Sequence, residues 1–149
     1  MARLNVILPA VVLAGALLKV VLVLHPAVVK DGQEEFLPMR VTAYLQDAQL
    51  PGPMFNSYNW GGYLLFALPE QPVFVDGRTD LYGDDFLSNV YIPAAAGRPG
   101  WDATLDQYGI RLVVVEPQSG LARVLRERPE WAVRYEDEQA VVFTREGGA

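Results

Sequence analysis

Two short polar clusters carry most of the side chains in this sequence that could bind a ligand. The first reads Asn56-Ser-Tyr-Asn-Trp-Gly-Gly-Tyr63, and the second reads Asp76-Gly-Arg-Thr-Asp80. Each cluster follows a short apolar segment that is typical of a β-strand. If these two strands are parallel neighbours, both clusters lie at the same edge of the sheet, where open α/β sheets bind their ligands. The pattern therefore predicts a recognition site.

The residue types in these clusters are suited to gripping a sugar or a peptide. Aromatic rings supply apolar area, whereas amides and a paired arginine and aspartate supply oriented hydrogen bonds. The residues that we assign to substrate binding are Asn56, Tyr58, Asn59, Trp60, Tyr63, Asp76, Arg78 and Asp80. Gly61 and Gly62 would let a ligand approach the backbone closely. In the alternative, structural interpretation, the first cluster is a tight turn with its rings in the core, and the second is a turn in which Arg78 bridges Asp76 and Asp80. We also predict that Arg78 forms a salt bridge with Asp76 or Asp80 and is largely buried.

Residues for catalysis are scarce. The chain contains no cysteine and one histidine, His25. These counts exclude disulfides, thiolate zinc sites and cysteine nucleophiles, and they argue against a Ser-His-Asp triad. Carboxylate pairs for glycoside hydrolysis can be drawn from Asp76, Asp80 and Glu116, but nothing in the sequence sets their separation. We therefore assign no catalytic residue.

Metal ions, nucleotide cofactors and nucleic acids are not expected as ligands. The acidic string Asp76, Asp80, Asp84 and Asp85 has a spacing that matches no standard cation-binding loop, so we predict no metal site. The sequence has no Gly-rich nucleotide motif, so we expect no cofactor. The net charge is −6, and the 12 basic residues form no cluster. Because nucleic-acid binding requires concentrated positive charge, we expect no such partner.

An apolar run from Val6 to Leu24 contains a single charged residue, Lys19. At 1.5 Å per residue, a helix of this length spans roughly 28 Å, about the thickness of a bilayer core. We predict that residues 4–25 cross a membrane. The alternatives are a signal peptide, although the small residues Ala14-Gly-Ala16 lie inside the run, and a buried helix, although the run is apolar on every side. The 149 residues then divide into a membrane helix with its linker, residues 1–35, and one domain, residues 36–149.

Short apolar strands alternate with helices in the second part of the chain. We predict adjacent strands over residues 54–58, 73–76 and 111–116, and an antiparallel hairpin at the edge of the sheet over residues 131–135 and 140–144. Helices are predicted from Pro38, over 61–68, 84–90 and 100–108, and from Ser119 to Arg128. This alternation predicts an α/β domain with three layers and a mostly parallel sheet that ends in a C-terminal antiparallel hairpin.

The same residues resemble a known family. A terminal apolar helix, the run FNSYNWGGYLLFALPEQPVFVDGRTDLYG and a valine-rich strand resemble the extracytoplasmic C-terminal domain of bacterial polytopic membrane proteins related to GT-C-type glycosyltransferases. The resemblance covers Phe36 to Arg145. A more distant similarity is to the catalytic subunit of oligosaccharyltransferase, whose Trp-Trp-Asp-Tyr-Gly motif helps to bind the acceptor peptide. Here Asn59 precedes Trp60 and no aspartate follows it, so peptide-sequon binding is not carried over.

The resemblance implies an acceptor-recognition or structural domain of a membrane glycosyltransferase that uses polyprenyl-phosphate sugars. The catalytic carboxylate of such enzymes lies in an early extracytoplasmic loop among many membrane helices, so this chain alone is expected to be inactive. The alternative is a membrane-anchored module that binds a glycan or a peptide without transferase activity. Expected partners are the membrane, a polytopic transferase half or other membrane helices, and a glycan or peptide acceptor. The chain is expected to pass the cell membrane once, with its domain outside the cytoplasm.

Overall fold

The computed structural model describes residues 4–26, 28, 36–50 and 52–147. The chain forms two compact units, residues 1–37 and residues 38–149. The first unit contains α1 (Leu4–Val23), whose apolar side chains, such as Val11, Leu13 and Leu18, are exposed. Within the described ranges, no helix is both long enough and apolar enough to cross a membrane, so the predicted span over residues 4–25 is not confirmed.

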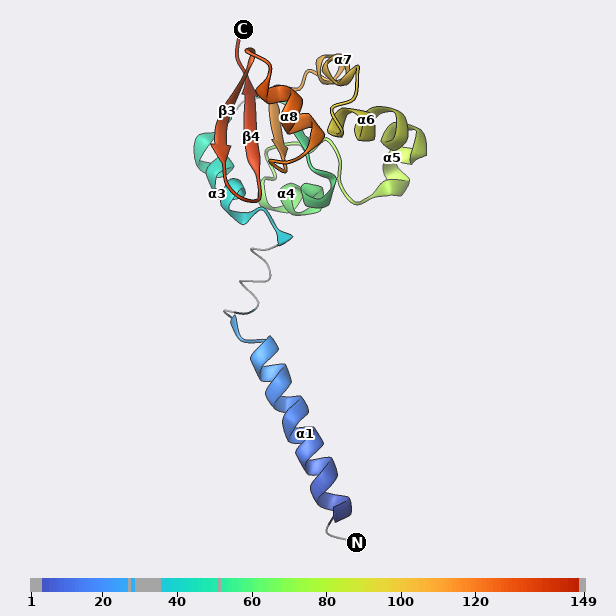
Figure 1. The fold of residues 1–149 in the computed structure, drawn as a ribbon, viewed down its shortest axis with the longest axis vertical. Helices are drawn as coiled ribbons and strands as arrows, with labels where there is room; N and C mark the ends of the chain where they lie inside the picture. The colour runs from blue at the N-terminus through green and yellow to red at the C-terminus, as the bar shows by residue number, and fades with distance from the viewer. Residues whose placement is uncertain (1–3, 27, 29–35, 51, 148–149) are drawn as a thin grey trace. The chain divides into compact units, whose positions relative to one another are not determined.

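A four-stranded mixed sheet forms the centre of the second unit (Figure 1). Its strands are β1 (Met54–Asn56), β2 (Leu112–Val115), β3 (Trp131–Glu136) and β4 (Val141–Arg145). The strands lie in the order β1-β2-β4-β3. β1 and β2 are parallel, with Phe55 opposite Val113, whereas β4 is antiparallel to both β2 and β3. The predicted α/β class is therefore confirmed.

The sequence predicts a mostly parallel sheet with an antiparallel hairpin at its edge. The hairpin is confirmed, since β3 is an edge strand paired with β4, whereas the mostly parallel sheet is wrong. Only β1 and β2 form a parallel pair among the four strands. β4 lies between β2 and β3, and all four residues Val141–Thr144 are buried. A strand that is buried on both faces belongs in the interior of a sheet, because its backbone groups then find partners on both sides. The predicted strand over residues 73–76 is absent, since these residues adopt no regular secondary structure.

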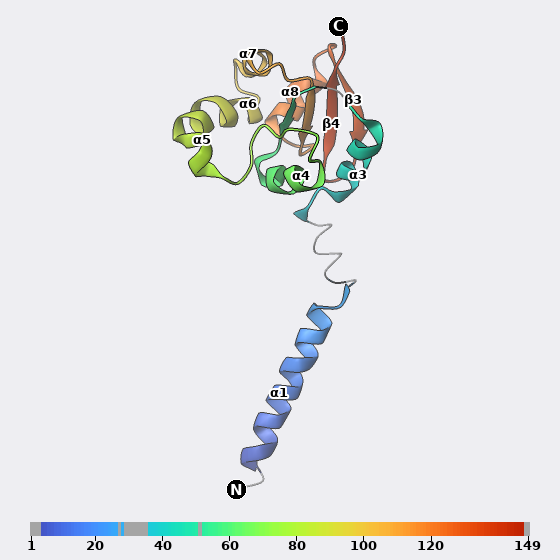
Figure 2. The ribbon, with the colours of Figure 1, turned by 180° about the vertical axis from the view of Figure 1, so that it is seen from behind.

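Helices cover both faces of this sheet, because alternate residues of a strand point to opposite sides. The helices are α3 (Met39–Ala48), α4 (Gly61–Ala67), α5 (Thr79–Phe86), α6 (Ile92–Ala95), α7 (Trp101–Gln107) and α8 (Gly120–Arg126). Phe55 and Phe143 belong to one hydrophobic core, which α6, α7 and α8 cover. Met54 and Val142 belong to a second core, which α3 and α4 cover (Figure 2). A short 3-10 helix, η1 (Tyr58–Trp60), precedes α4, and a π-helical segment, η2 (Leu87–Tyr91), follows α5.

Local signals explain several of these boundaries. Ser119 caps α8, as predicted, because its hydroxyl oxygen accepts a hydrogen bond from Ala122 N at 3.2 Å. In the turn between β3 and β4, one carboxylate oxygen of Asp137 accepts hydrogen bonds from the backbone N–H groups of Gln139 and Ala140, each at 2.8 Å. Asparagine and aspartate favour such turns because their side chains bond to the backbone a few residues ahead.

Candidate functional site

Asn56, the last residue of β1, holds a neighbouring segment in place with its side chain. Its Oδ1 accepts hydrogen bonds from Phe74 N at 2.8 Å and Val75 N at 3.3 Å, and its Nδ2 donates to Val75 O at 2.8 Å. The buried amide of Asn56 thus forms the hydrogen bonds with the backbone of Phe74 and Val75 that a neighbouring β-strand would form in a sheet. This is why residues 73–76 lie beside the end of β1 without forming the predicted strand.

Gly61 lets the start of α4 approach the same segment. A Cβ atom built on Gly61 would lie 2.0 Å from Val75 O and 2.6 Å from Asp76 Cα. Any side chain at this position would therefore clash with backbone. The close approach predicted for this glycine exists, but its partner is the protein's own backbone. A Cβ on Gly62, in contrast, would meet nothing within 4 Å.

Asp76 and Arg78 form a two-point ion pair at the surface end of this segment. Arg78 Nη2 donates to Oδ2 of Asp76 at 2.6 Å and Arg78 Nε donates to Oδ1 at 3.0 Å, while the backbone N–H of Arg78 donates to Oδ1 at 2.9 Å. The predicted pairing of Arg78 with Asp76 is confirmed. The side chain of Asp76 is only 2% exposed but that of Arg78 is 62% exposed, so the prediction that Arg78 is largely buried is wrong.

The charge state of this pair follows from its geometry. The hydrogen bonds and positive charge of Arg78 lower the pKa of the Asp76 carboxyl from 3.8 to about 2. The Asp76 carboxylate in turn raises the pKa of the Arg78 guanidinium. Both groups are therefore charged at neutral pH, and the carboxylate fixes the orientation of the exposed guanidinium.

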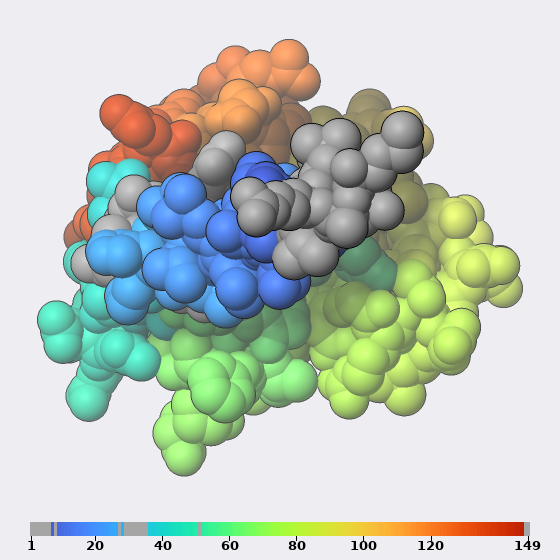
Figure 3. All heavy atoms as spheres, turned by 90° about the horizontal axis from the view of Figure 1, so that it is seen from below, coloured from blue at the N-terminus to red at the C-terminus, as the bar shows by residue number. Residues whose placement is uncertain are grey.

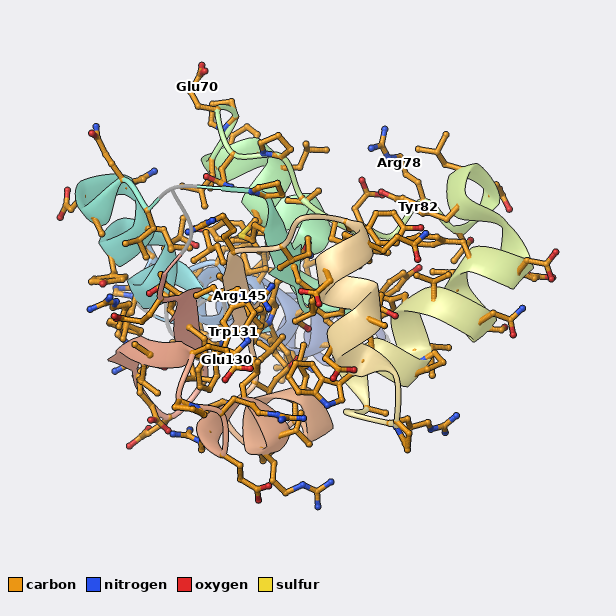
Figure 4. All side chains as sticks on the ribbon, turned by 90° about the horizontal axis from the view of Figure 1, so that it is seen from above. Glu70, Arg78, Tyr82, Glu130, Trp131 and Arg145 are labelled. Atoms are coloured by element: carbon orange, nitrogen blue, oxygen red, sulfur yellow. The ribbon has the colours of Figure 1, made fainter. Side chains whose placement is uncertain are left out.

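Tyr82 lies beside this ion pair and belongs to a cluster of four aromatic rings. Burial and the neighbouring Asp76 carboxylate raise the pKa of Tyr82. The ring of Tyr82 stacks on Phe86, with centroids 5.6 Å apart, and Phe86 packs against Phe74 and Tyr108. Figure 4 shows Arg78 and Tyr82 together beside α5. The exposed guanidinium therefore lies next to partly exposed aromatic surface.

Polar groups at the ends of β1 and β2 form hydrogen bonds with one another. The hydroxyl of Ser57 donates to Oε1 of Glu116 at 2.6 Å, which links the ends of the two parallel strands. The hydroxyl of Tyr91 accepts a hydrogen bond from Tyr58 N at 2.7 Å and donates to Asn56 O at 3.3 Å. Burial raises the pKa of Tyr91, so this hydroxyl remains neutral. These groups complete one another's hydrogen bonds at this edge of the sheet.

The eight predicted substrate-binding residues separate into an interior group and a surface group. Asn56 and Trp60 lie in the interior, and the ring of Trp60 is 4% exposed against α3 and α4. The buried ring of Trp60 agrees with the structural alternative, and neither of these two side chains can contact a ligand without rearrangement. Tyr58 and Tyr63 are half-buried, Asp76 is covered as described, and the side chains at the surface are those of Asn59, Arg78 and Asp80.

A groove that the sequence did not indicate lies between α3 and the segment after α4. It has a volume of about 460 Å³ and is lined by Leu45, Gln46, Gln49, Leu50, Ala67, Leu68, Pro69, Glu70 and Gln71. Gln46 Nε2 donates to Ala67 O at 3.1 Å across the groove, and Gln71 Nε2 donates to Gly52 O at 2.7 Å. Gln46, Gln49 and Gln71 near the helix ends are the only sign of this groove in the sequence. They come together only because α3 packs against α4.

Two features of this arrangement are suited to binding a ligand. Arg78 can present hydrogen-bond donors to an anionic group, and the groove has the apolar lining and few polar groups that are typical of ligand sites. In the described part of the chain, no three carboxylate or imidazole side chains gather as a metal site. No protein-family model, curated protein or solved structure matches this chain.

Proposed function

We propose that this chain is a non-catalytic acceptor-recognition domain of a GT-C-like membrane glycosyltransferase system. The family resemblance of the NWGGYL and FVDGR segments suggests the system. The observation that carries the recognition role is the exposed guanidinium of Arg78, held at two points by the buried carboxylate of Asp76. An arginine held in this way loses little conformational entropy when it binds a ligand.

The proposed ligand is an acceptor that carries a carboxylate or another anionic group next to an apolar or sugar face. The remaining N–H donors of Arg78 would bind the anion, and the half-buried ring of Tyr82 would support the adjoining face. Asn59 and Asp80 would supply further hydrogen bonds at the rim. Asp76 would act as a positioning residue through Arg78, not as a ligand contact.

The chemistry of the carboxylates supports a role without catalysis. A general acid at neutral pH needs a raised pKa, whereas the pKa of Asp76 is lowered to about 2 by Arg78. Glu116 is engaged by the hydroxyl of Ser57. The proposal therefore leaves the transfer reaction to another polypeptide, and it assigns to the apolar N-terminal segment, residues 4–25, the task of holding the domain outside the cytoplasm at a membrane.

The binding proposal can be tested by NMR with the full chain in lipid nanodiscs. The Nε–Hε signal of Arg78 would be followed during titration with a neutral disaccharide, a uronic-acid disaccharide, and an acidic and a neutral peptide. We expect the acidic probes to shift this signal. In Arg78→Gln, which lacks it, we expect the backbone N–H signals around residue 78 not to respond to the probes, because binding is lost. Arg126→Gln is the matched control, because Arg126 forms a similar exposed two-point pair with Glu136.

Two results would overturn the proposal. An equal loss of binding in both arginine variants would mean that general charge, and not the Asp76–Arg78 pair, attracts the probe. Transfer of sugar from a polyprenyl-phosphate donor by this chain alone would contradict the non-catalytic role.

The groove favours a second candidate, a membrane-anchored module that binds a neutral glycan or peptide without a transferase. Its volume of about 460 Å³ and its glutamine side chains suit hydroxyl and amide groups. If this candidate is right, the neutral probes bind, and Gln49→Asn weakens them while Arg78→Gln does not. Asparagine is chosen because Gln49 has a positive φ of 44°, which asparagine tolerates. Gln107→Asn, an exposed position at the end of α7, is the control.

A further inference from the structure

The outward side of α4 is apolar, although it is exposed. The helix Gly61–Ala67 contains no charged residue. Its inward residue Leu64 is fully buried in the core with α3, whereas Leu65 is 42% exposed and Phe66 is 85% exposed. Pro69, in the turn that follows, is also exposed. We call Leu65, Phe66 and Pro69 the α4 face.

The fold of the domain does not account for this face. A phenyl ring that is 85% exposed gains little from packing, and a surface helix normally turns charged or polar side chains outward. A cluster of exposed apolar side chains indicates a surface that a membrane or another molecule covers. We propose that the α4 face inserts into the lipid surface of the membrane that holds the N-terminal segment.

Lipid is the occupant that the rest of the chain favours. Figures 1 and 2 show α4 and the beginning of α3 at the same end of the domain. Residues 24–38 join α1 to α3, and a stretch of that length reaches at most roughly 50 Å when fully extended. If α1 is held in a membrane, the end of the domain that carries α4 stays within this distance of it.

The composition of α4 also defines the kind of lipid contact. Because α4 has no lysine or arginine, the contact would depend on apolar burial and not on anionic headgroups. Insertion should therefore not require anionic lipid, and salt should not weaken it in zwitterionic bilayers. Figure 3 shows that α4 and α5 both reach the surface on this side of the domain. The exposed Leu81 of α5 is a second apolar side chain that could approach the bilayer.

This inference rests on the proposed membrane attachment, and the two can be tested separately. The chain has no cysteine, so single-cysteine variants of the full chain can carry one spin label each in phosphatidylcholine nanodiscs. Phe66→Cys probes the α4 face, Leu13→Cys probes α1, and Ala103→Cys is the control in α7. Figures 1 and 2 show α7 at the opposite end of the domain from α4.

We expect the label at position 66 to be several-fold more accessible to oxygen than to a water-soluble nickel chelate, like the label at 13, whereas the label at 103 prefers the chelate. The pattern should not require anionic lipid, and in phosphatidylcholine it should not change with salt. If the label at 66 behaves like that at 103 while the label at 13 is in lipid, the α4 inference is wrong and the attachment stands. If the label at 13 is also in water, the attachment itself is wrong. Protection of the label at 66 from both reagents, with spin–spin broadening, would mean that a second copy covers the face.

Discussion

At the scale of single residues, Asn56 is the amide on which the candidate site depends. It makes hydrogen bonds with Phe74 and Val75 from the end of β1, and its side chain is fully buried. Removing it would leave several backbone groups without partners in the interior. A buried polar group that loses its partner costs about 1–3 kcal/mol.

We therefore expect Asn56→Ala to lower the free energy of unfolding by about 2–4 kcal/mol, which is the loss expected for more than one such group. Asn56→Asp should be at least as harmful, because aspartate cannot donate to Val75 O and would place a charge in the core. Urea unfolding measures both. Asn59→Ala, three residues further on at an exposed position, should change the free energy by less than about 0.5 kcal/mol. Equal effects at the two positions would contradict this role of Asn56.

Asp76 should make the stability of the domain depend on pH in the acid range. Arg78 lowers its folded pKa from 3.8 to about 2, so the folded state favours the ionised form. The stabilisation is then fully present above the unfolded pKa and is lost as the pH falls from about 4 to about 2. Because Arg78 is largely exposed to screening solvent, the contribution is no more than about 2 kcal/mol.

The measurement is the free energy of unfolding of the parent and of Asp76→Asn across this range of pH. Asparagine does not titrate, so the difference between the two proteins isolates this carboxylate from the others. We expect the parent to be the more stable at pH 6 and the difference to shrink below pH 4. A difference that is constant with pH would mean that Asp76 acts through hydrogen bonds alone.

At the scale of elements, two adjacent glycines at the start of α4 have opposite roles. A Cβ on Gly61 would overlap Val75 O at 2.0 Å, whereas one on Gly62 would meet nothing within 4 Å. Both positions are helical, so alanine at Gly62 should stabilise the helix by about 0.5–1 kcal/mol. Alanine at Gly61 must push α4 away from residues 75–76.

We expect Gly61→Ala to destabilise the domain by about 2 kcal/mol or more, as overpacking against fixed backbone does. Gly62→Ala is the matched control, with the same chemical change one residue away. Thermal unfolding of the two variants checks the prediction, and the Nε–Hε signal of Arg78 should shift only in Gly61→Ala. If both variants melt like the parent, the contact between α4 and residues 75–76 is looser than the structure shows.

At the scale of the whole molecule, the second unit contains its own interior. Both hydrophobic cores among the described residues draw their members from Val41 onward. We therefore expect a chain that begins at residue 38 to fold, with a melting temperature within about 4 °C of the full chain, which corresponds to less than about 1 kcal/mol. Calorimetry of both chains in the same detergent tests this. A much lower melting temperature would show that residues 1–37 contribute to the stability of the domain.

The sequence alone determined the elements whose signals are local. Three consecutive valines specified β2, the polar turn between two apolar segments specified the β3–β4 hairpin, and Ser119 specified the start of α8. Such signals depend on the periodicity and chemistry of a few neighbouring residues, and these are visible along the chain. The pairing of Arg78 with Asp76 was predictable for the same reason, since only Gly77 lies between them.

The tertiary structure decided how these elements meet. Burial on both faces placed β4 between β2 and β3, and the reach of one amide, that of Asn56, replaced the expected strand over residues 73–76. Packing against α3 and α4 buries Trp60 in the core, whereas Arg78 lies at the surface, so only one of these two residues can contact a ligand. These outcomes depend on contacts between residues that are distant in the sequence. The free energy of such contacts depends on the complete set of neighbours, which a local pattern does not contain.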